Sequence, residues 1–411
     1  MRRVVVTGLG TVNPLGLSTK ESWENCVNGV SGVGPITHFD ASEWLVNIAC
    51  EVKDFDPANY MRPPEVRRRD RFEQLATAAA QEALADSGLE ITEENAPRVG
   101  SIVSSAIGGL GTIQNAAFIL ENTGPRRVSP FVIPMLMPNG ASGLICIDTG
   151  AKGPALSVAS ACASGADGIG LAWRLIRGGE IDAAFAGASE ATICQVGVAS
   201  FDRLGAMSRR NDDYSMTPQP FDKHRDGLVM GEGAAILILE EYEHARARGA
   251  KIYAELAGYA ATADAFHITA PHGEGAGGAA AMRQAIDSAG LNIEEVDYIN
   301  AHGTATPLND SSETRAIKTA FGKRAYDVPI SSTKSMTGHM MGATGALEAI
   351  FCAEAIHNGV IPPTIHYETP DPECDLDYVP NEARDADVRV AISNAFGFGG
   401  HNAVLVLKKI A

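Results

Sequence analysis

The chain has 411 residues, of which 45% are hydrophobic and 20% charged, and it carries a formal net charge of −17. This length and apolar content exclude a disordered or fibrous protein and predict two domains or one large unit made of duplicated halves. The acidic balance argues against nucleic acid and against an anionic membrane surface as partners, because both would repel the chain.

Cysteine usage and the first residues bear on the compartment. Seven cysteines without regular spacing, and without a CxxC pair, favour a reducing compartment and predict neither a disulfide framework nor a metal site. The apolar run near the N-terminus covers only Val4 to Val6, which is too short for a secretory signal, so we expect a cytoplasmic protein. Residues 128–147 are uncharged but contain three prolines, which argues against a membrane span and predicts a buried loop.

Apolar runs predict strands along the whole chain, and helical patterns closed by glycine alternate with them. Several strand runs are apolar without alternation, so we expect an α/β protein whose sheets are covered by helices on both faces. The expected strands are 4–7, 100–104, 155–159, 183–186, 234–239, 297–301, 328–332, 388–393 and 403–407, and the expected helices are 70–87, 163–177, 279–289 and 343–357.

A weak internal echo suggests duplication. A helix start rich in small residues follows Cys162, and another follows His339. The charged segment 240–249 ends in glycine and is the expected boundary between the two halves. We therefore divide the chain into an N-terminal half, residues 1–250, and a C-terminal half, residues 251–411.

Cys162 is the candidate nucleophile. Residues 157–166, Ser-Val-Ala-Ser-Ala-Cys-Ala-Ser-Gly-Ala, predict a strand that runs into a helix with the cysteine at the junction. There the thiol faces unpaired backbone N–H groups and the positive end of the helix dipole, which can lower a cysteine pKa to between roughly 3.5 and 7.5. The alternative for any single cysteine is a small buried core residue, and the other six cysteines fit it.

Two histidines and a lysine lie where further predicted strands end. His302 follows the strand 297–301 and precedes a glycine and two hydroxyl residues, which is typical of a ligand-facing loop. His339 follows the strand 328–332, and Lys334 lies between that strand and His339, where its charge could stabilise a developing enolate. Taken alone, each histidine also fits a capping or core role and the lysine a surface role.

Glycine-rich segments occur near both ends of the chain. Residues 394–402, Asn-Ala-Phe-Gly-Phe-Gly-Gly-His-Asn, predict a turn in which a main-chain N–H can serve an oxyanion while Phe398 covers the site. An ordinary hairpin is the alternative. Residues 8–14 begin Gly-x-Gly after a strand, but Asn13 replaces the third glycine and Pro14 opposes a helix, so we expect no dinucleotide site.

Four segments together resemble the β-ketoacyl-[acyl-carrier-protein] synthases, and in particular their type II, elongating members. They are residues 160–165, 300–307, 332–339 and 394–402, and the likeness extends over nearly the whole chain. The resemblance implies a thiolase-like αβαβα fold of two similar halves, acting as a homodimer. It implies fatty-acid chain elongation, in which an acyl group condenses with malonyl-acyl-carrier-protein to give 3-oxoacyl-acyl-carrier-protein and CO2. It implies no cofactor beyond the phosphopantetheine of the carrier.

The resemblance also implies roles for single residues. Cys162 would carry the acyl chain, with its own backbone N–H and that of Phe398 as the oxyanion hole. His302 and His339 would bind the malonyl thioester carbonyl, promote loss of carbon dioxide and stabilise the carbanion. The remaining implied residues are Lys334 and Glu313, which would order the site, and Thr304 and Thr306, which would hold the phosphopantetheine arm.

Further positions concern the acyl pocket and the carrier. The pocket would contain Ile107 and Phe201, with Phe398 as its gate, and residues 131–137 would reach it from the neighbouring subunit. Acyl carrier protein would dock on arginines that otherwise read as solvated surface. These are Arg67, Arg68, Arg126 and Arg127, and the first two lie in a basic run with Arg62, Arg69 and Arg71.

Some positions depart from the family pattern. Gly205 stands where an arginine is often found, although Arg203 is close by, and His401 stands where many members have threonine. The segment 138–140 also differs, so the resemblance implies no particular acyl chain length.

Related enzymes and one other class were weighed against this interpretation. A freestanding polyketide ketosynthase would use the same residues and stays open. A thiolase would need a second cysteine as acid and base, an initiating synthase usually has asparagine in place of one histidine, and a chain-length factor typically lacks the nucleophile. A cysteine hydrolase fits Cys162 but leaves the second histidine and Lys334 without a role.

Overall fold

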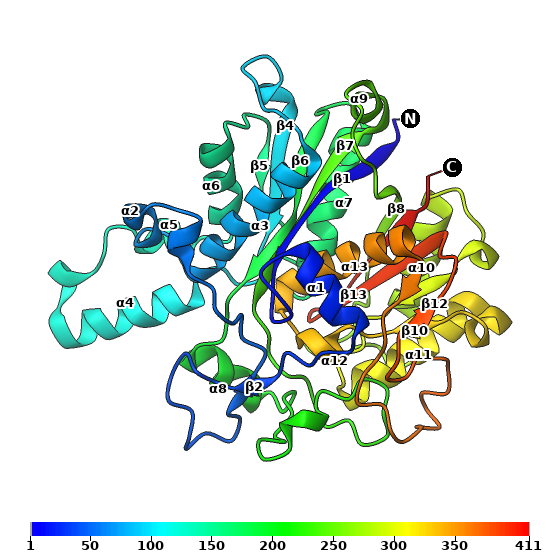
Figure 1. Cartoon of the computed structure of the whole chain (residues 1–411). Coiled ribbons are helices and arrows are strands. Elements are labelled where there is room, and N and C mark those ends of the chain that lie inside the picture. The colour runs from blue at the N-terminus through cyan, green and yellow to red at the C-terminus, as the bar shows by residue number, and fades with distance from the viewer. Residues whose placement is uncertain (1, 411) are drawn as a thin grey trace.

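The computed structural model describes residues 2–410, and strands from both halves of the chain form one ten-stranded sheet (Figure 1). The strand order is β10-β9-β13-β14-β8-β1-β7-β6-β4-β5. The strands are β1 (Val4–Val12), β4 (Val99–Ser104), β5 (Ala155–Leu156), β6 (Ala183–Glu190) and β7 (Gly233–Glu241), followed by β8 (Ala254–Ala263), β9 (Tyr298–Asn300), β10 (Ile330–Ser331), β13 (Val390–Gly397) and β14 (His401–Lys408).

Strand directions repeat on the two sides of the sheet centre. On one side β7 is antiparallel to both β1 and β6, whereas β6, β4 and β5 are parallel to one another. On the other side β14 is antiparallel to both β8 and β13, whereas β13, β9 and β10 are parallel. The two sides join where Val5 and Val6 of β1 pair with β8. This mirrored order confirms the expected α/β fold of two similar halves.

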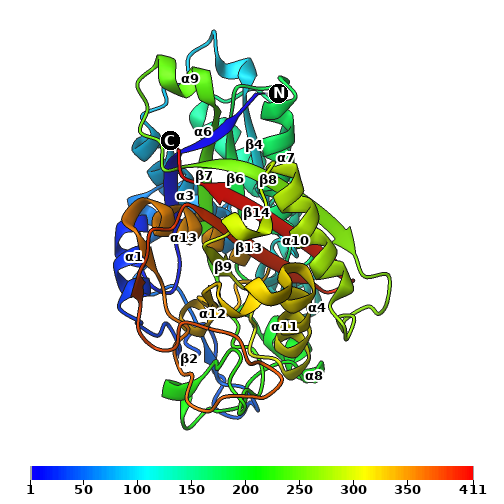
Figure 2. The ribbon, with the colours of Figure 1, turned by 90° about the vertical axis from the view of Figure 1, so that its right-hand side faces the viewer.

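Helices pack on the outer face of the sheet in each half of the chain (Figures 1 and 2). In the first half, α3 (Arg71–Ser87) packs on β1 and β7, and α6 (Gly140–Thr149) packs on β4. In the second half, α10 (Ala276–Ser288) packs on β8 and β14, and α11 (Pro307–Phe321) packs on α10. Each outer layer has its own hydrophobic core.

The middle layer consists of α7 (Ser164–Arg177) and α13 (Thr344–Asn358), which pack against each other. One hydrophobic core surrounds these two helices and takes residues from strands of both halves. Successive residues of a buried strand therefore face different cores, as expected from the twofold repeat of a strand. In β7, for example, Ile236 belongs to the outer core and Leu237 to the middle core.

The structure confirms the nine expected strands and the four expected helices, but corrects the expectation for residues 128–147. That stretch contains α5 (Val132–Leu136) and most of α6 rather than a buried loop. Pro134 lies in the first turn of α5, where a helix needs no N–H donor, so the proline does not prevent the helix. The stretch is also not buried, since Ile133 is 61% exposed and Ile147 is 77% exposed.

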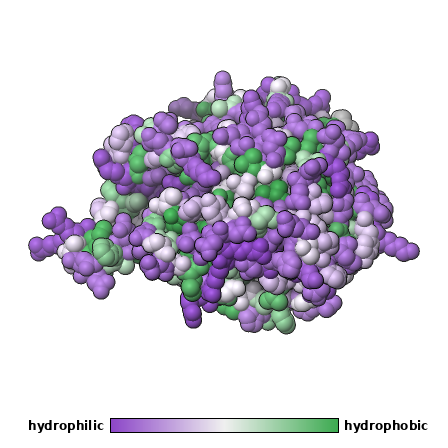
Figure 3. All heavy atoms as spheres, turned by 60° about the horizontal axis from the view of Figure 1, so that its bottom comes forward, coloured by the Kyte–Doolittle hydropathy of each residue, from purple (hydrophilic) through white to green (hydrophobic). Residues whose placement is uncertain are grey.

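An arm formed largely by α4 (Leu110–Thr123) projects from the body (Figure 1). Phe118 and Leu120 on this arm are 66% and 52% exposed, and apolar atoms show on the projection in Figure 3. Large exposed apolar side chains that gather on one element mark a surface for contact with another protein.

The remaining elements are α1 (Thr19–Val27), α2 (Pro63–Val66), α8 (Gln195–Arg203), α9 (Tyr242–Ala247), α12 (Lys334–Thr337) and the short pairs β2 (Gly34–Pro35) with β3 (Ile48–Ala49) and β11 (Val360–Ile361) with β12 (Arg384–Asp385).

Within residues 2–410, no helix has both the length and the apolar character that a bilayer crossing requires.

The contact between α7 and α13 generates a prediction about stability. A Cβ added at Gly165 of α7 would lie 2.7 Å from the carbonyl oxygen of Gly342 and 2.9 Å from the backbone nitrogen of Ala346. Overpacking of this kind costs about 1 to 3 kcal/mol, so Gly165→Ala should lower the free energy of unfolding by that amount in urea denaturation. In α6, Gly143→Ala serves as the control, because its added Cβ meets nothing within 4 Å. Equal stability of the two variants would contradict the tight contact.

Candidate active site

Cys162 lies two residues before α7, at the end of the middle layer. The preceding residue, Ala161, has a φ of 51°, in the left-handed region that L-residues rarely adopt. The turn is held by Ser164, whose hydroxyl donates to the Ala161 carbonyl at 2.6 Å and accepts from the Ser160 N–H at 2.9 Å. A strained backbone held in this way fixes the direction in which the thiol points.

Burial determines the protonation of this thiol. Cys162 is 8% exposed, and desolvation raises its pKa to about 11, although hydrogen bonds from the backbone N–H groups of Phe398 and Cys162 and the charge of Lys334 act to lower the pKa. This corrects the expectation that the junction holds a thiolate. The backbone N–H groups expected there do reach the sulfur, but the loss of hydration outweighs them.

The glycine-rich turn of residues 397–400 lies against the nucleophile. It joins β13 and β14 as an antiparallel hairpin, in which Gly397 pairs with His401. A Cβ at Gly397 would lie 2.9 Å from the Ser160 carbonyl oxygen and 3.0 Å from the Cys162 nitrogen. Glycine is therefore required at this position for the turn to bring the Phe398 N–H to the thiol.

His302 follows β9 and is held through its main chain. One carboxylate oxygen of Glu313 accepts the His302 N–H at 2.8 Å, and the other accepts the Gly303 N–H at 2.7 Å. The side-chain amide of Asn394 also donates to Glu313 at 3.1 Å. Burial, with the nearby charge of Lys334, lowers the pKa of His302 well below its ordinary value, so the ring is neutral at pH 7.

His339 precedes α13 in the second half of the chain, as Cys162 precedes α7 in the first half. Its Nδ1 lies 3.0 Å from the hydroxyl of Thr344, a partner that the sequence analysis missed. Burial and then Lys334 lower the pKa of His339 well below its ordinary value. The two imidazole rings are perpendicular, with centroids 5.4 Å apart, so the two histidines form one site as expected.

Lys334 at the start of α12 is 1% exposed and pairs with a residue that the sequence analysis did not single out. Its Nζ donates to Glu348 of α13 at 2.5 Å, whereas Glu313, the expected acidic partner, binds the main chain at His302. Burial is the larger effect and raises the pKa of Glu348 above its ordinary value, although the charge and the hydrogen bond of Lys334 act to lower it. The sequence did carry one signal for Glu348, because a single acid in the apolar first turns of a helix requires a buried partner.

A cavity of about 330 Å³ brings most of the expected residues together. Thr304 and Thr306 lie in its wall with their hydroxyl oxygens 2.9 Å apart, and Phe201 stacks on Phe398 with ring centroids 6.3 Å apart. Within the described chain, Ile107 does not line this cavity; its N–H donates to the buried carboxylate of Glu190. The lining includes Cys162, Phe201, Gly205, His302, Thr304, Thr306, His339, Phe396 and Phe398.

The arginines lie away from this cavity and fall into two groups. Three are bound to carboxylates: Arg62 to Glu65, Arg69 to Asp148 and Arg71 to Glu232. Arg67, Arg68, Arg126 and Arg127 are exposed, and none pairs with a carboxylate of residues 2–410. The guanidinium of Arg68 lies 4.8 Å from the ring centre of Phe131.

His, Cys, Asp and Glu side chains of residues 2–410 form no cluster that could hold a metal ion.

Comparisons with known proteins identify the family to which the chain is similar. The family models of the beta-ketoacyl synthase N-terminal domain and C-terminal domain match residues 1–245 and 253–368. The chain is 50% identical over 408 residues to the 3-oxoacyl-[acyl-carrier-protein] synthase 2 of Staphylococcus aureus (strain COL), which covers 99% of this chain and 98% of the relative.

Two solved structures extend the likeness to the fold. One is a beta-ketoacyl synthase from Burkholderia phymatum STM815, with a TM-score of 0.92 and 37% identity. The other comes from a type II PKS acyl-carrier protein in complex with its ketosynthase bound to the hexaketide, with a TM-score of 0.92 and 35% identity. Both matches cover 100% of each chain. The chain therefore belongs to the beta-ketoacyl synthase family.

Proposed function

We propose that the chain elongates fatty acids as a 3-oxoacyl-[acyl-carrier-protein] synthase, with Cys162 as the acyl carrier and His302 and His339 as the site for the malonyl unit. The observation that carries this proposal is the single cavity in which one buried thiol and two neutral imidazoles meet. The full-length likeness to a curated 3-oxoacyl-[acyl-carrier-protein] synthase supports fatty-acid elongation over a polyketide role.

Acylation begins when the sulfur of Cys162 attacks the thioester carbonyl of an acyl carrier. At pH 7 a thiol with a pKa of about 11 requires roughly 5 kcal/mol to ionise, so the proton passes to a base as the bond forms. His302 and His339 are neutral and can accept it, and when the tetrahedral intermediate collapses the proton passes to the pantetheine sulfur of the carrier, which leaves as a thiol. The backbone N–H groups of Cys162 and Phe398, which bind the thiol in the free enzyme, then receive the oxyanion.

Decarboxylation follows when a malonyl thioester enters the same cavity. The Thr344 hydroxyl can donate to Nδ1 of His339, which leaves the ring proton on Nε2 for donation to the thioester carbonyl. His302 provides the second donor. Loss of CO2 leaves an enolate whose negative oxygen these two donors stabilise, and its carbon attacks the acyl-cysteine to form the 3-oxoacyl product and return the cysteine sulfur.

Lys334 and Glu313 are positioning residues in this scheme. The Lys334–Glu348 pair joins α12 to α13 behind the imidazoles, and Glu313 holds the His302 loop by two backbone N–H groups. Thr304 and Thr306 line the route to the cysteine and bind the phosphopantetheine arm of the carrier, and no cofactor of the enzyme's own takes part. Phe201 and Phe398 close the acyl pocket, and Ile107, which lies outside the cavity lined by these two rings, is proposed as a further residue of that pocket.

The partners follow from two surfaces. Acyl carrier protein docks on the exposed cations Arg67, Arg68, Arg126 and Arg127, because an acidic enzyme needs such a local patch to bind an acidic partner. A second copy of the chain covers the apolar arm of α4, with residues 131–137 beside it, to form a homodimer.

We place this enzyme in the cytoplasm. We divide it into an N-terminal half, residues 1–250, which carries the nucleophile, and a C-terminal half, residues 251–411, which carries both histidines.

The reaction separates into halves that a pair of variants can test. With malonyl carrier and acyl carriers of graded length, the unchanged enzyme should give 3-oxoacyl products and CO2, read by mass. Cys162→Ala should release CO2 without condensation, and His302→Ala should lower CO2 release by at least about 100-fold, since it loses one carbonyl donor. Because both imidazoles are already neutral, CO2 release by Cys162→Ala should change less than about twofold between pH 6.5 and 8. Equal CO2 release by the two variants would contradict the division of roles.

The raised pKa of Cys162 predicts how its alkylation depends on pH. Below the pKa the thiolate fraction rises about tenfold for each pH unit, so labelling of Cys162 by iodoacetamide should rise roughly 100-fold from pH 7 to 9. Peptide mass mapping measures the rate, with Cys162→Ala as the control for other sites. A plateau below pH 8 would show a thiolate already formed at neutral pH, against the dominance of burial.

Carrier docking predicts a dependence on salt. Arg67→Glu plus Arg126→Glu should raise the KM for malonyl carrier by about tenfold or more at low salt, and the difference should shrink as added salt screens the charges. Lys152→Glu plus Lys323→Glu changes the net charge equally at two exposed lysines and is the control. An unchanged KM in the arginine variant would place the docking surface elsewhere.

A further inference from the structure

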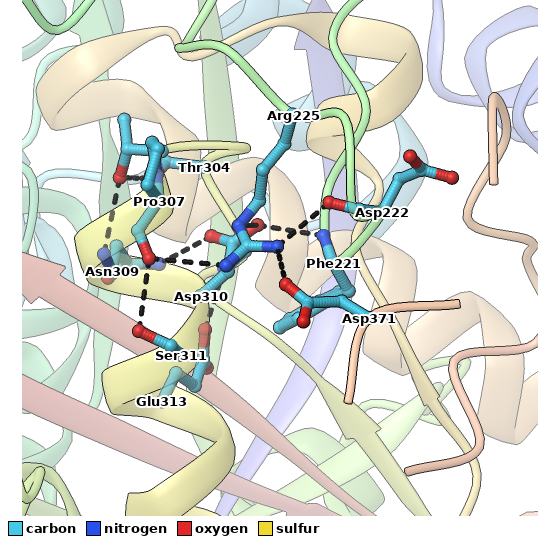
Figure 4. Close-up of polar contacts among 12 residues, drawn as sticks. Phe221, Asp222, Arg225, Thr304, Pro307, Asn309, Asp310, Ser311, Glu313 and Asp371 are labelled. Carbon is cyan, nitrogen blue, oxygen red and sulfur yellow. Dashed lines mark hydrogen bonds and ion pairs between the residues drawn. The ribbon is translucent and has the colours of Figure 1, made fainter. Parts of the chain in front are cut away.

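Arg225 is a buried arginine outside the reacting groups, between α8 and β7. Its side chain is 4% exposed, although arginine is among the residues least often buried. The guanidinium lies between Asp371 and the first turn of α11 (Figure 4). A buried cation stays charged only when several acceptors surround it.

The guanidinium connects three segments of the chain. Nη1 donates to the carbonyl of Asp222 at 2.8 Å and to the carboxylate of Asp371 at 2.5 Å. Nη2 donates to the carbonyl of Pro307 at 3.3 Å, and Nε lies 3.9 Å from the carboxylate of Asp310. Because its donors point in fixed directions, one arginine can hold the three hydrogen-bond acceptors, the carbonyls of Asp222 and Pro307 and the carboxylate of Asp371, at the same time, with Asp310 as a nearby counter-charge.

The first turn of α11 is joined to the loop that carries the cavity threonines. Asp310, which is fully buried, accepts the N–H of Phe221 at 2.8 Å, and the backbone N–H of Ala305 also bonds to it. The carbonyl of Ala305 accepts the N–H of Gly227 at 3.0 Å. Ala305 itself has a φ of 66°, a conformation that needs such support.

We infer that Arg225 is a positioning residue for the Thr304–Thr306 segment, and thereby for the pantetheine arm of the carrier-bound substrate. The inference rests on the proposed function. Arg225 touches no reacting atom, since it holds the outer side of a loop whose inner side lines the cavity. Its loss should therefore weaken substrate binding more than it slows the chemistry at Cys162.

Arg225→Lys tests this, because lysine keeps the charge but cannot reach the three acceptors together. The KM for malonyl carrier should rise about tenfold, a loss equivalent to one charge-assisted hydrogen bond, while kcat changes less than about threefold. The rate of Cys162 alkylation should stay within about twofold of that of the unchanged enzyme. A fall in kcat and in alkylation at constant KM would show general structural damage and overturn the inference.

A double-variant cycle with Thr304→Val tests the route of the effect. If Arg225 acts through the threonine segment, the two variants together should raise KM by less than the product of their separate effects. If KM in the double variant rises by the full product of the two separate effects, the inference is overturned. Arg248→Lys is the control, because Arg248 binds the buried carboxylate of Glu240 away from the cavity, and its KM should not change.

A second variant and an assay of the unchanged enzyme distinguish a folding failure from a failure of the inference. If Arg225→Lys shows no cooperative melting transition, Asp371→Asn is measured in the same way, since it removes one acceptor and keeps its shape; a folded Asp371→Asn with unchanged KM would overturn the inference. The unchanged enzyme is assayed alongside. If it forms no 3-oxoacyl product, the proposed function itself fails, whereas product with an unaltered KM in the Arg225 variant refutes the positioning role alone.

Discussion

The active site depends on the contact between α7 and α13, because this contact places the nucleophile of one half beside a histidine of the other. Each helix begins at the same end of the middle layer, and each is preceded by a reactive residue, Cys162 in one half and His339 in the other. Their backbones come close only because Gly165 and Gly345 lack side chains at the crossing. The spacing of thiol and imidazole is therefore set by helix packing rather than by flexible loops.

Removal of water then sets the protonation of every reacting group. The same desolvation that raises the pKa of Cys162 lowers the pKa values of His302 and His339, so the resting cavity holds a thiol and two uncharged rings. Uncharged rings suit the chemistry, because a cation beside the malonyl carboxylate would stabilise it and oppose its loss as CO2. The nearest cation, Lys334, is already bound to Glu348.

The sequence alone predicted nine strands of the large sheet, four of its helices and three residues that line one cavity, Cys162, His302 and His339, because apolar runs and strand-to-helix junctions are local features. It missed β8, whose residues 254–263 are rich in alanine and glycine and have little preference for a strand. It also missed Glu348 and Thr344, because partners on neighbouring helices depend on how the helices pack. The thiolate expected at Cys162 was wrong for a related reason: the dipole of a helix is visible in the sequence, whereas the depth of burial is not.

The position of β14 has a consequence for how the chain is made. This strand lies between β8 and β13, so the sheet of the second half has a gap until residues 401–408 have been synthesised. Until then β8 and β13 present unpaired edges, which are prone to join other chains. Similarly, β7, the partner strand of β1, is synthesised more than 200 residues after β1. The nascent enzyme thus spends most of its translation with open sheets, and its yield in a cell should be governed by whatever shields those edges on the ribosome.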